Sequence, residues 1–260
     1  MLRATSCNAP PYLADNICRI LTCEQQLPPI PSNYDKFKAN SGVKFVIDKG
    51  CSNKSIERKD VIKLYEQPDL TTAVIGTMIW GLMSTRFGHF QRMLAAEEKA
   101  LRLERVRGLV EANDIRGAFE SMQYKGLNSI AGIGYAYFTK IFYLIGQVSL
   151  KVSPKPLILD KWTQNAYCAL LVQIDKKKAA ELFLIDSSGN AKPKSSRLVD
   201  CYLSYIRDMH DWALELCRFF KVSIDSASLE MFVFGTNLRT DSNNTNPRQE
   251  LRKILLSVNW

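Results

Sequence analysis

Residues 126–140 read Gly-Leu-Asn-Ser-Ile-Ala-Gly-Ile-Gly-Tyr-Ala-Tyr-Phe-Thr-Lys, and this stretch decides the fold. Gly132 and Gly134 flank one apolar residue between two helical patterns, so the chain can turn tightly there and bring its bare backbone close to another molecule. Ile133 would plug the turn into the core. The amide groups at the start of the following helix then face outward, where their partial positive charge suits a phosphate. The pattern predicts a helix-hairpin-helix at about residues 120–150 that grips a duplex backbone.

A lone carboxylate, Asp160, follows the apolar run at residues 157–159 and precedes a plausible helix start at residues 161–167. At that place it would be an N-cap, and the helix amides would keep it ionised. The simpler interpretation is a helix cap worth about 1 kcal/mol. With the hairpin upstream, a catalytic role is favoured over the cap alone.

The hairpin, the apolar helix after it, Lys140 and Asp160 twenty residues later together resemble the helix-hairpin-helix DNA glycosylases. Within these, the resemblance is greatest to the bacterial and archaeal proteins of the 8-oxoguanine DNA glycosylase (OGG) fold. It is densest over residues 127–167 and weaker over residues 79–81 and 229–235. It implies a mainly α fold and an enzyme that acts on a base flipped out of double-stranded DNA. It also implies a backbone contact by the hairpin residues Gly132, Ile133, Gly134, Tyr135 and Ala136.

One hairpin position differs from the bifunctional members of that family, which carry a nucleophilic lysine two residues after the second glycine. This sequence has Ala136 there. Family enzymes without that lysine generally use water as the nucleophile and the aspartate alone. The resemblance therefore implies a monofunctional glycosylase, in which Asp160 stabilises the oxocarbenium-like charge that develops at C1′ as the base leaves.

Lys140 lies four residues after Ala136, so on a helix it projects from the same face about 6 Å further along the axis. Most of its neighbours are apolar, and a charged side chain among them needs a definite partner, for which we expect Asp160. Two roles are open for Lys140: an active-site lysine, including the Schiff-base nucleophile of a lyase, or a lysine that contacts the DNA backbone.

Composition agrees with a DNA-binding protein. The 260 residues carry 35 Lys and Arg against 26 Asp and Glu, a formal charge of +9, which favours a polyanionic partner. The seven cysteines include no Cys-x-x-Cys pair and the chain has only two histidines, so we expect no metal and no cofactor. The sequence has no signal peptide and no apolar run of bilayer length, so we expect a soluble, cytoplasmic monomer without a membrane partner.

The chain is predicted to have an irregular N-terminal segment with short elements, residues 1–60, packed on a helical core, residues 61–260. Pro28, Pro29 and Pro31 interrupt the first part, and residues 45–47 hint at a strand. Polar loops are expected at residues 186–195 and 237–248. Apart from the hairpin helices, helical patterns cover residues 58–65, 70–85, 89–112, 115–122, 161–172, 196–220 and 226–234.

Four further residues are candidates for a base pocket or for a wedge that fills the gap left by an extruded base: Trp80, Arg86, His89 and Phe234. Gly88 allows a loop near the first three, and Phe234 lies in the C-terminal segment of the resemblance. For Trp80 a buried core position is the simpler interpretation, and an amphipathic core helix would explain Phe234 equally well.

Three functions remain open. The first is excision of a hypermodified base of phage DNA, such as glucosylated hydroxymethylcytosine, in antiviral defence, which the resemblance to a defence branch and Ala136 favour. The second is 8-oxoguanine repair by a glycosylase and AP lyase that uses Lys140. The third is a noncatalytic helix-hairpin-helix protein that binds DNA and releases no base.

Overall fold

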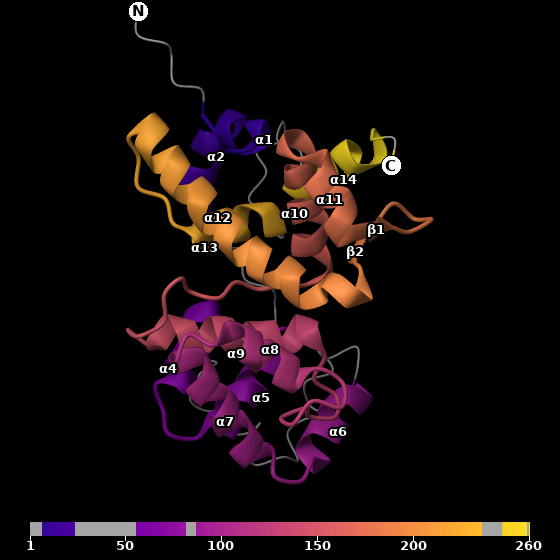
Figure 1. Ribbon diagram of the computed structural model, residues 1–260. Coiled ribbons are helices and arrows are strands. Elements are labelled where there is room, and N and C mark those ends of the chain that lie inside the picture. Colours follow the sequence, from indigo (N-terminus) through magenta and orange to yellow (C-terminus); the bar gives the residue numbers. More distant parts are fainter. Residues whose placement is uncertain (1–6, 24–55, 82–86, 236–245, 259) are drawn as a thin grey trace, which may run out of the picture. The chain divides into compact units, whose positions relative to one another are not determined.

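The computed structural model describes residues 7–23, 56–81, 87–235, 246–258 and 260. Helices dominate these residues and the only strands among them form one short hairpin, which confirms the mainly α fold. The chain divides into two compact units (Figure 1). One unit comprises Leu27–Ile158, and the other comprises Met1–Gln26 with Leu159–Trp260.

The unit Leu27–Ile158 contains the hairpin and a core of aromatic and aliphatic side chains. Phe119, Phe138 and Phe142 are buried there, with the ring of Phe138 lying 4.7 Å from that of Phe119 and 5.3 Å from that of Phe142. Its helices among the described residues are α4 (Arg58–Tyr65), α5 (Leu70–Trp80), α6 (Phe87–Ala95), α7 (Lys99–Glu111), α8 (Ile115–Met122) and α9 (Tyr135–Val148).

Helix α9 is central to this unit because it is apolar on most faces, and its residues 138–146 are all buried. Helices α4, α5, α7 and α8 contact it. A Cβ at Gly146 would lie 2.7 Å from the ring of Pro156, so the glycine allows the chain after α9 to pack back on the helix.

The second unit is built around α10 (Lys161–Ile174), which contacts α11 (Lys176–Leu182), α13 (Ser226–Phe234) and α14 (Pro247–Leu256) (Figure 1). Its aromatic core includes Tyr167, Tyr202 and Tyr205, all fully buried. The remaining elements of this unit are α1 (Pro11–Asp15), α2 (Ile17–Leu21), β1 (Phe183–Ile185), β2 (Ala191–Pro193), the 3-10 helix η3 (Ser195–Arg197) and α12 (Leu198–Phe220).

A largely buried carboxylate supports this packing. The carboxylate of Asp208 on α12 accepts hydrogen bonds from the hydroxyl of Tyr167, at 2.7 Å, and from Nζ of Lys178, at 2.5 Å. These contacts tie α10, α11 and α12 together at a point where Asp208 is largely excluded from water. A buried carboxylate that accepts from one charged and one neutral donor is well compensated.

Several predicted boundaries need correction. The single helix predicted over residues 89–112 is two helices, α6 and α7, with a break at residues 96–98. Glu98 has φ 52°, in the left-handed region, and neither glycine nor proline marks the break in the sequence. The end predicted for the helix at residues 70–85 partly lies outside the described residues, since α5 ends at Trp80 and residues 82–86 are not described.

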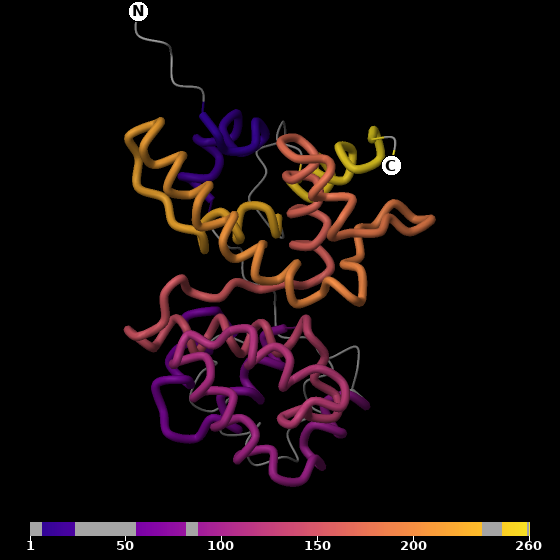
Figure 2. The backbone as a smooth tube through the Cα atoms, viewed as in Figure 1, coloured from indigo at the N-terminus to yellow at the C-terminus, as the bar shows by residue number. Residues whose placement is uncertain are grey.

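The polar loop predicted at residues 186–195 is wrong over its second half, because residues 191–193 form β2 and pair antiparallel with β1. Figure 2 shows this hairpin as a narrow double trace. Asp186 organises the turn by accepting the backbone amides of Ser188 and Asn190, each at 2.9 Å. These bonds, with that from Asn190 the strongest influence, lower the pKa of the Asp186 carboxyl to about 2.

Helices α1 and α2 are the short elements described in the N-terminal segment that is predicted to be irregular with short elements. At the other end, α14 begins at Pro247, inside the loop expected at residues 237–248, which corrects that boundary. Residues 236–245 and the strand hint at residues 45–47 lie outside the described residues. Among the helices that are described, none has the length and apolar character needed to span a bilayer.

Candidate active site

The predicted hairpin joins α8 to α9. Gly134 is the residue before α9, with an extended backbone, and Ile133 is buried as expected for the plug of the turn. Gly132 has φ 90°, a conformation that residues with a side chain rarely adopt. A Cβ there would also collide with the carbonyl oxygen of His89 on α6. The tight turn is therefore fixed by its own backbone geometry and by α6.

The outer side of the turn is open. Gly134 is exposed, and nothing among the described residues lies within 4 Å of the position that a Cβ there would occupy. Tyr135 and Ala136, the first residues of α9, are partly exposed, and the amides at this end of the helix point along its axis. The arrangement suits a phosphate that approaches along the axis of α9.

Lys140 lies on α9 with only 8% of its surface exposed. Its Nζ donates a hydrogen bond to the carbonyl oxygen of Ala136 at 3.1 Å and lies 5.7 Å from the centre of the Tyr137 ring. Gly81 also approaches this side chain, because a Cβ there would lie 3.6 Å from Cδ of Lys140. The amine thus points back along the helix toward residue 136.

Asp160 is the N-cap of α10, as the sequence predicts. Its Oδ1 accepts the backbone amides of Trp162, at 2.9 Å, and Thr163, at 3.2 Å. The hydroxyl of Thr163 in turn accepts the amide of Asp160 at 2.8 Å, which completes a capping box. The side chain is partly exposed, so this carboxylate is fixed in direction and still accessible.

Buried polar groups lie behind Asp160. Tyr205 on α12 and Glu230 on α13 are both almost fully buried. Burial raises the pKa of the Tyr205 hydroxyl well above its ordinary value, and the negative charges of Glu230 and Asp160 raise it further. The hydroxyl is therefore held protonated beside the carboxylate.

Two aromatic rings and an arginine lie on the accessible side of α10. The guanidinium carbon of Arg248, in the first turn of α14, lies 4.4 Å from the ring centres of both Trp162 and Phe234. Burial lowers the pKa of Arg248 to about 10, and the charge of Asp160 opposes that shift. Phe234, a predicted pocket residue, thus lies within one cluster with Trp162, Arg248 and Asp160.

The other predicted pocket or wedge residues do not lie in this cluster among the described residues. Trp80 is 8% exposed, and Cζ of Arg58 lies 5.4 Å from the centre of the Trp80 ring. This position favours the core interpretation. His89 is partly buried, and its backbone braces Gly132. Arg86 lies outside the described residues. In the part of the chain that is described, no three His, Cys, Asp or Glu side chains gather as a metal site would require.

Comparison with known families agrees with this geometry. Residues 25–234 match the model of the family described as "Putative 8-oxoguanine DNA glycosylase OGG-like protein". The chain belongs to this OGG-like family. Membership confirms the resemblance to the OGG fold and supports a DNA-binding protein with DNA glycosylase activity. Searches among curated proteins and among solved structures gave no match for this OGG-like protein.

The family match covers the hairpin, Lys140, Asp160, Trp162 and Phe234. Among the described residues, three helices lie outside it: α1 and α2 before residue 25, and α14 after residue 234. Arg248 therefore lies outside the part of the chain that matches the family model.

Sequence reasoning missed two residues of the cluster. Trp162 was assigned only to the start of a helix, and Arg248 to the end of a loop. A signal for α14 was present, because Asn246 and Pro247 are an N-cap residue followed by a proline at the first helical position. Leu251 and Leu255 then follow at helical spacing, and both are buried.

Proposed function

We propose that this OGG-like protein is a monofunctional DNA glycosylase that hydrolyses the N-glycosidic bond of a flipped-out modified base and leaves an abasic site. The observation that carries the proposal is the carboxylate of Asp160, fixed by the amides of Trp162 and Thr163 and partly exposed. A carboxylate that cannot rotate away is preorganised for a positive charge that appears only during the reaction.

The chemistry follows from the bond that breaks. As the base leaves C1′, the sugar becomes oxocarbenium-like, and Asp160 stabilises that charge and orients the attacking water. The α10 amides fix the direction of the carboxylate for this role. Ala136 at the position of the family's nucleophilic lysine supports water as the nucleophile.

DNA is held through its backbone. The open side of the hairpin, from Gly132 to Ala136, offers amides of the α9 terminus to a phosphate, and Gly134 lets the strand approach without steric hindrance. The formal charge of +9 adds an attraction that does not depend on sequence and weakens with salt. Backbone grip and base excision are thus assigned to different residues.

The substrate proposed first is a hypermodified cytosine of phage DNA, such as glucosylated hydroxymethylcytosine, in a defence role. Ala136 supports this choice, because it removes the lyase lysine typical of the bifunctional repair enzymes. Oxidised guanine, the base named in the family description, is the alternative substrate.

Release of free bases tests the proposal. The protein is incubated with oxidised DNA, deaminated DNA and genomic DNA of phages with modified cytosines, and the released bases are identified by mass spectrometry. Asp160→Asn should lower release by roughly 100-fold or more while DNA binding stays nearly intact. Asparagine caps a helix about as well as aspartate, so the fold is preserved.

Asp225→Asn is the matched control, because Asp225 caps α13 in the same unit by accepting the amide of Ser228 at 2.7 Å. The same substitution there should leave release unchanged. Equal release by Asp160→Asn and the wild type would refute the catalytic assignment. If the protein binds these DNAs but releases no base from any of them, its function is noncatalytic DNA binding.

A glycosylase with lyase activity is a second candidate, and one contact favours it. Nζ of Lys140 bonds the carbonyl oxygen of Ala136 and so reaches back by one helical turn toward the place of the family's nucleophile. An amine there would attack C1′ and displace the base. The C1′–O4′ bond then opens, O4′ takes a proton from the amine, and a Schiff base forms, which water cannot do.

A further inference from the structure

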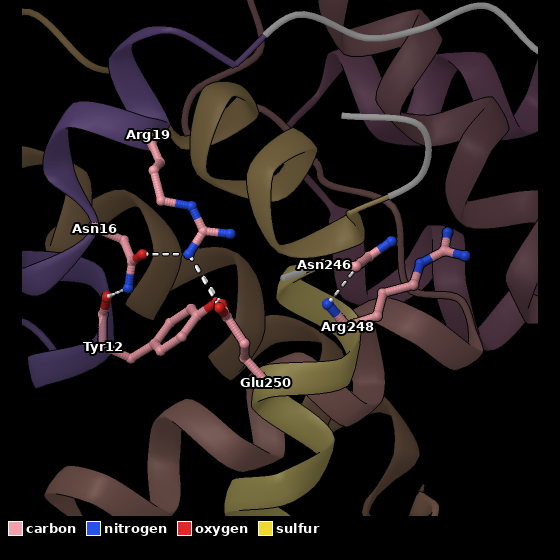
Figure 3. A network of polar contacts seen from close by, with 6 residues as sticks. All are labelled: Tyr12, Asn16, Arg19, Asn246, Arg248 and Glu250. Carbon is pink, nitrogen blue, oxygen red and sulfur yellow. Dashed lines mark hydrogen bonds and ion pairs between the residues drawn. The ribbon is translucent and has the colours of Figure 1, made fainter. Parts of the chain in front are cut away.

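The terminal helices of the chain hold each other. Glu250 on α14 accepts a hydrogen bond from the hydroxyl of Tyr12 on α1 and pairs with Arg19 of α2 at 3.0 Å (Figure 3). Asn16 joins the network through Nη1 of Arg19, at 2.6 Å. These helices lie outside residues 25–234, the part of the chain that matches the family model.

Helix α14 places one cation on residues of the matched region. Figure 3 shows the side chains of Glu250 and Arg248 leaving α14 in different directions. Arg248 lies over the rings of Trp162 and Phe234, and its Nε donates a hydrogen bond to the carbonyl oxygen of Phe234. Gly235 permits this approach, because a Cβ there would lie 3.2 Å from Cγ of Arg248.

The position of the guanidinium is costly. Its Nη2 is buried and has no hydrogen-bond partner among the described residues. A charged donor that is buried without an acceptor loses its hydration without compensation. The two aromatic faces and the bond to Phe234 offset part of that loss.

We propose that Trp162 and Phe234 form a stacking slot for a planar nucleobase, and that Arg248 fills this slot in the DNA-free protein and leaves it when a base enters. The inference rests on the proposed function, since it names the residues that receive the flipped base.

Three properties of the slot favour a base as its occupant. A guanidinium is flat and packs on aromatic faces, and a nucleobase uses the same faces in the same way. Trp162 is 37% exposed and Phe234 is partly exposed, so an incoming base has access. Trp162 lies two residues after Asp160, and its backbone amide donates a hydrogen bond to the Asp160 carboxylate. The slot therefore lies next to the proposed reaction centre.

A base can bind in the slot only if Arg248 leaves it. A base that stacks on Trp162 and Phe234 must supply the free energy that removes Arg248. Occupation of the slot by Arg248 therefore lowers the affinity for every base by the same factor. Once outside, the guanidinium regains hydration or meets a DNA phosphate. The arginine thus raises the free energy that any base must supply to enter the slot, and it leaves the ranking of the bases unchanged.

Binding of a fluorescent base tests the slot without any chemistry. The probe is a single-stranded oligonucleotide with one central 2-aminopurine, whose emission is quenched when it stacks on an aromatic ring. The full-length Asp160→Asn protein serves as the background. Adding Arg248→Ala should tighten binding by roughly 3- to 10-fold, because the slot is then empty at all times.

Arg252→Ala is the matched control for the lost charge. Arg252 lies one turn further along α14, where its Nη2 donates to the carbonyl oxygen of Ser188. Its loss should weaken binding slightly through the lost phosphate attraction. Weaker binding in Arg248→Ala than in the Arg252→Ala control would overturn the proposal, and so would full quenching in a Trp162→Leu variant.

A second measurement covers the case in which Arg248→Ala disturbs α14. The emission of Trp162 is obtained in the otherwise unaltered protein as the difference between the wild type and Trp162→Phe. It should change on addition of the probe, since a base replaces a cation over the ring. An unchanged Trp162 emission at saturating probe would also overturn the slot.

Failure of the slot and failure of the proposed function give different results. Asp160-dependent base release with no effect of Arg248→Ala on the probe would reject the slot alone. Quenching and tighter binding with no base release from any DNA would reject the glycosylase and keep the slot as a base-binding site.

Discussion

The carbonyl oxygen of His89 occupies the space that a side chain at Gly132 would need. The two residues come from different parts of the sequence, α6 and the hairpin, and meet because Gly132 takes φ 90°. The contact fixes the entry of the hairpin into α9. It also explains why His89, expected as a pocket or wedge residue, matters through its backbone.

Gly132→Ala should therefore destabilise the protein. The positive φ costs an alanine about 1 kcal/mol, and the contact with the His89 carbonyl forces the backbone to move, so we expect a loss of roughly 2–4 kcal/mol in the free energy of unfolding. Urea denaturation measures it. A loss below that of Gly134→Ala, where the side chain meets open space, would show that the contact carries no strain.

Gly134→Ala should act on DNA binding and leave stability nearly unchanged. Its φ of −87° suits an alanine, but a methyl group on the exposed turn would obstruct a phosphate at the α9 amides. We expect the Kd for a duplex to rise by roughly tenfold, as one or two lost backbone contacts imply. Fluorescence anisotropy gives the value, and Gly108→Ala on α7, also an open position, is the control. An unaltered Kd would remove the hairpin from the interface.

Local sequence signals predicted the hairpin and Asp160 because each depends on its immediate neighbours. Two glycines around Ile133 determine the turn, and an aspartate before an amphipathic run determines a cap. The helices at residues 58–65, 115–122 and 226–234 were predicted with their bounds for the same reason. The break at residues 96–98 was missed, since Glu98 adopts its left-handed conformation without a local signal.

The cluster at Arg248 was beyond local reasoning because its contacts join distant segments. Arg248 meets Trp162 across 86 positions of the sequence, and Glu250 meets Tyr12 across 238. Neither pairing follows from the periodicity of α14. The mixed polar sequence before it was therefore interpreted as a loop, although Asn246 and Pro247 mark a helix start.

The network of Glu250 predicts that the terminal helices stabilise each other. Glu250→Gln removes the charge that Arg19 and the hydroxyl of Tyr12 share, so we expect a loss of about 1–3 kcal/mol in the free energy of unfolding. Urea denaturation compares it with Glu120→Gln, whose pair with Arg116 is about half exposed on both sides and should cost under about 0.5 kcal/mol. Equal losses in the two variants would mean that the network adds nothing to stability.

The last prediction concerns Lys140. If water is the nucleophile, borohydride treatment during base release traps no covalent complex, because only an amine forms the Schiff base that borohydride reduces. Lys140→Met keeps the apolar stem and removes the amine that bonds the Ala136 carbonyl, which should cost about 1 kcal/mol of stability and leave base release within about tenfold of the wild type.

Lys155→Met provides the comparison, since Nζ of Lys155 also donates to a backbone carbonyl, that of Gln147 at 3.4 Å. A complex trapped with the wild type and with Lys155→Met but lost in Lys140→Met would assign the nucleophile to Lys140. The reaction would then cleave the strand as well as release the base, and Ala136 would mark a nucleophile moved by one helical turn along α9.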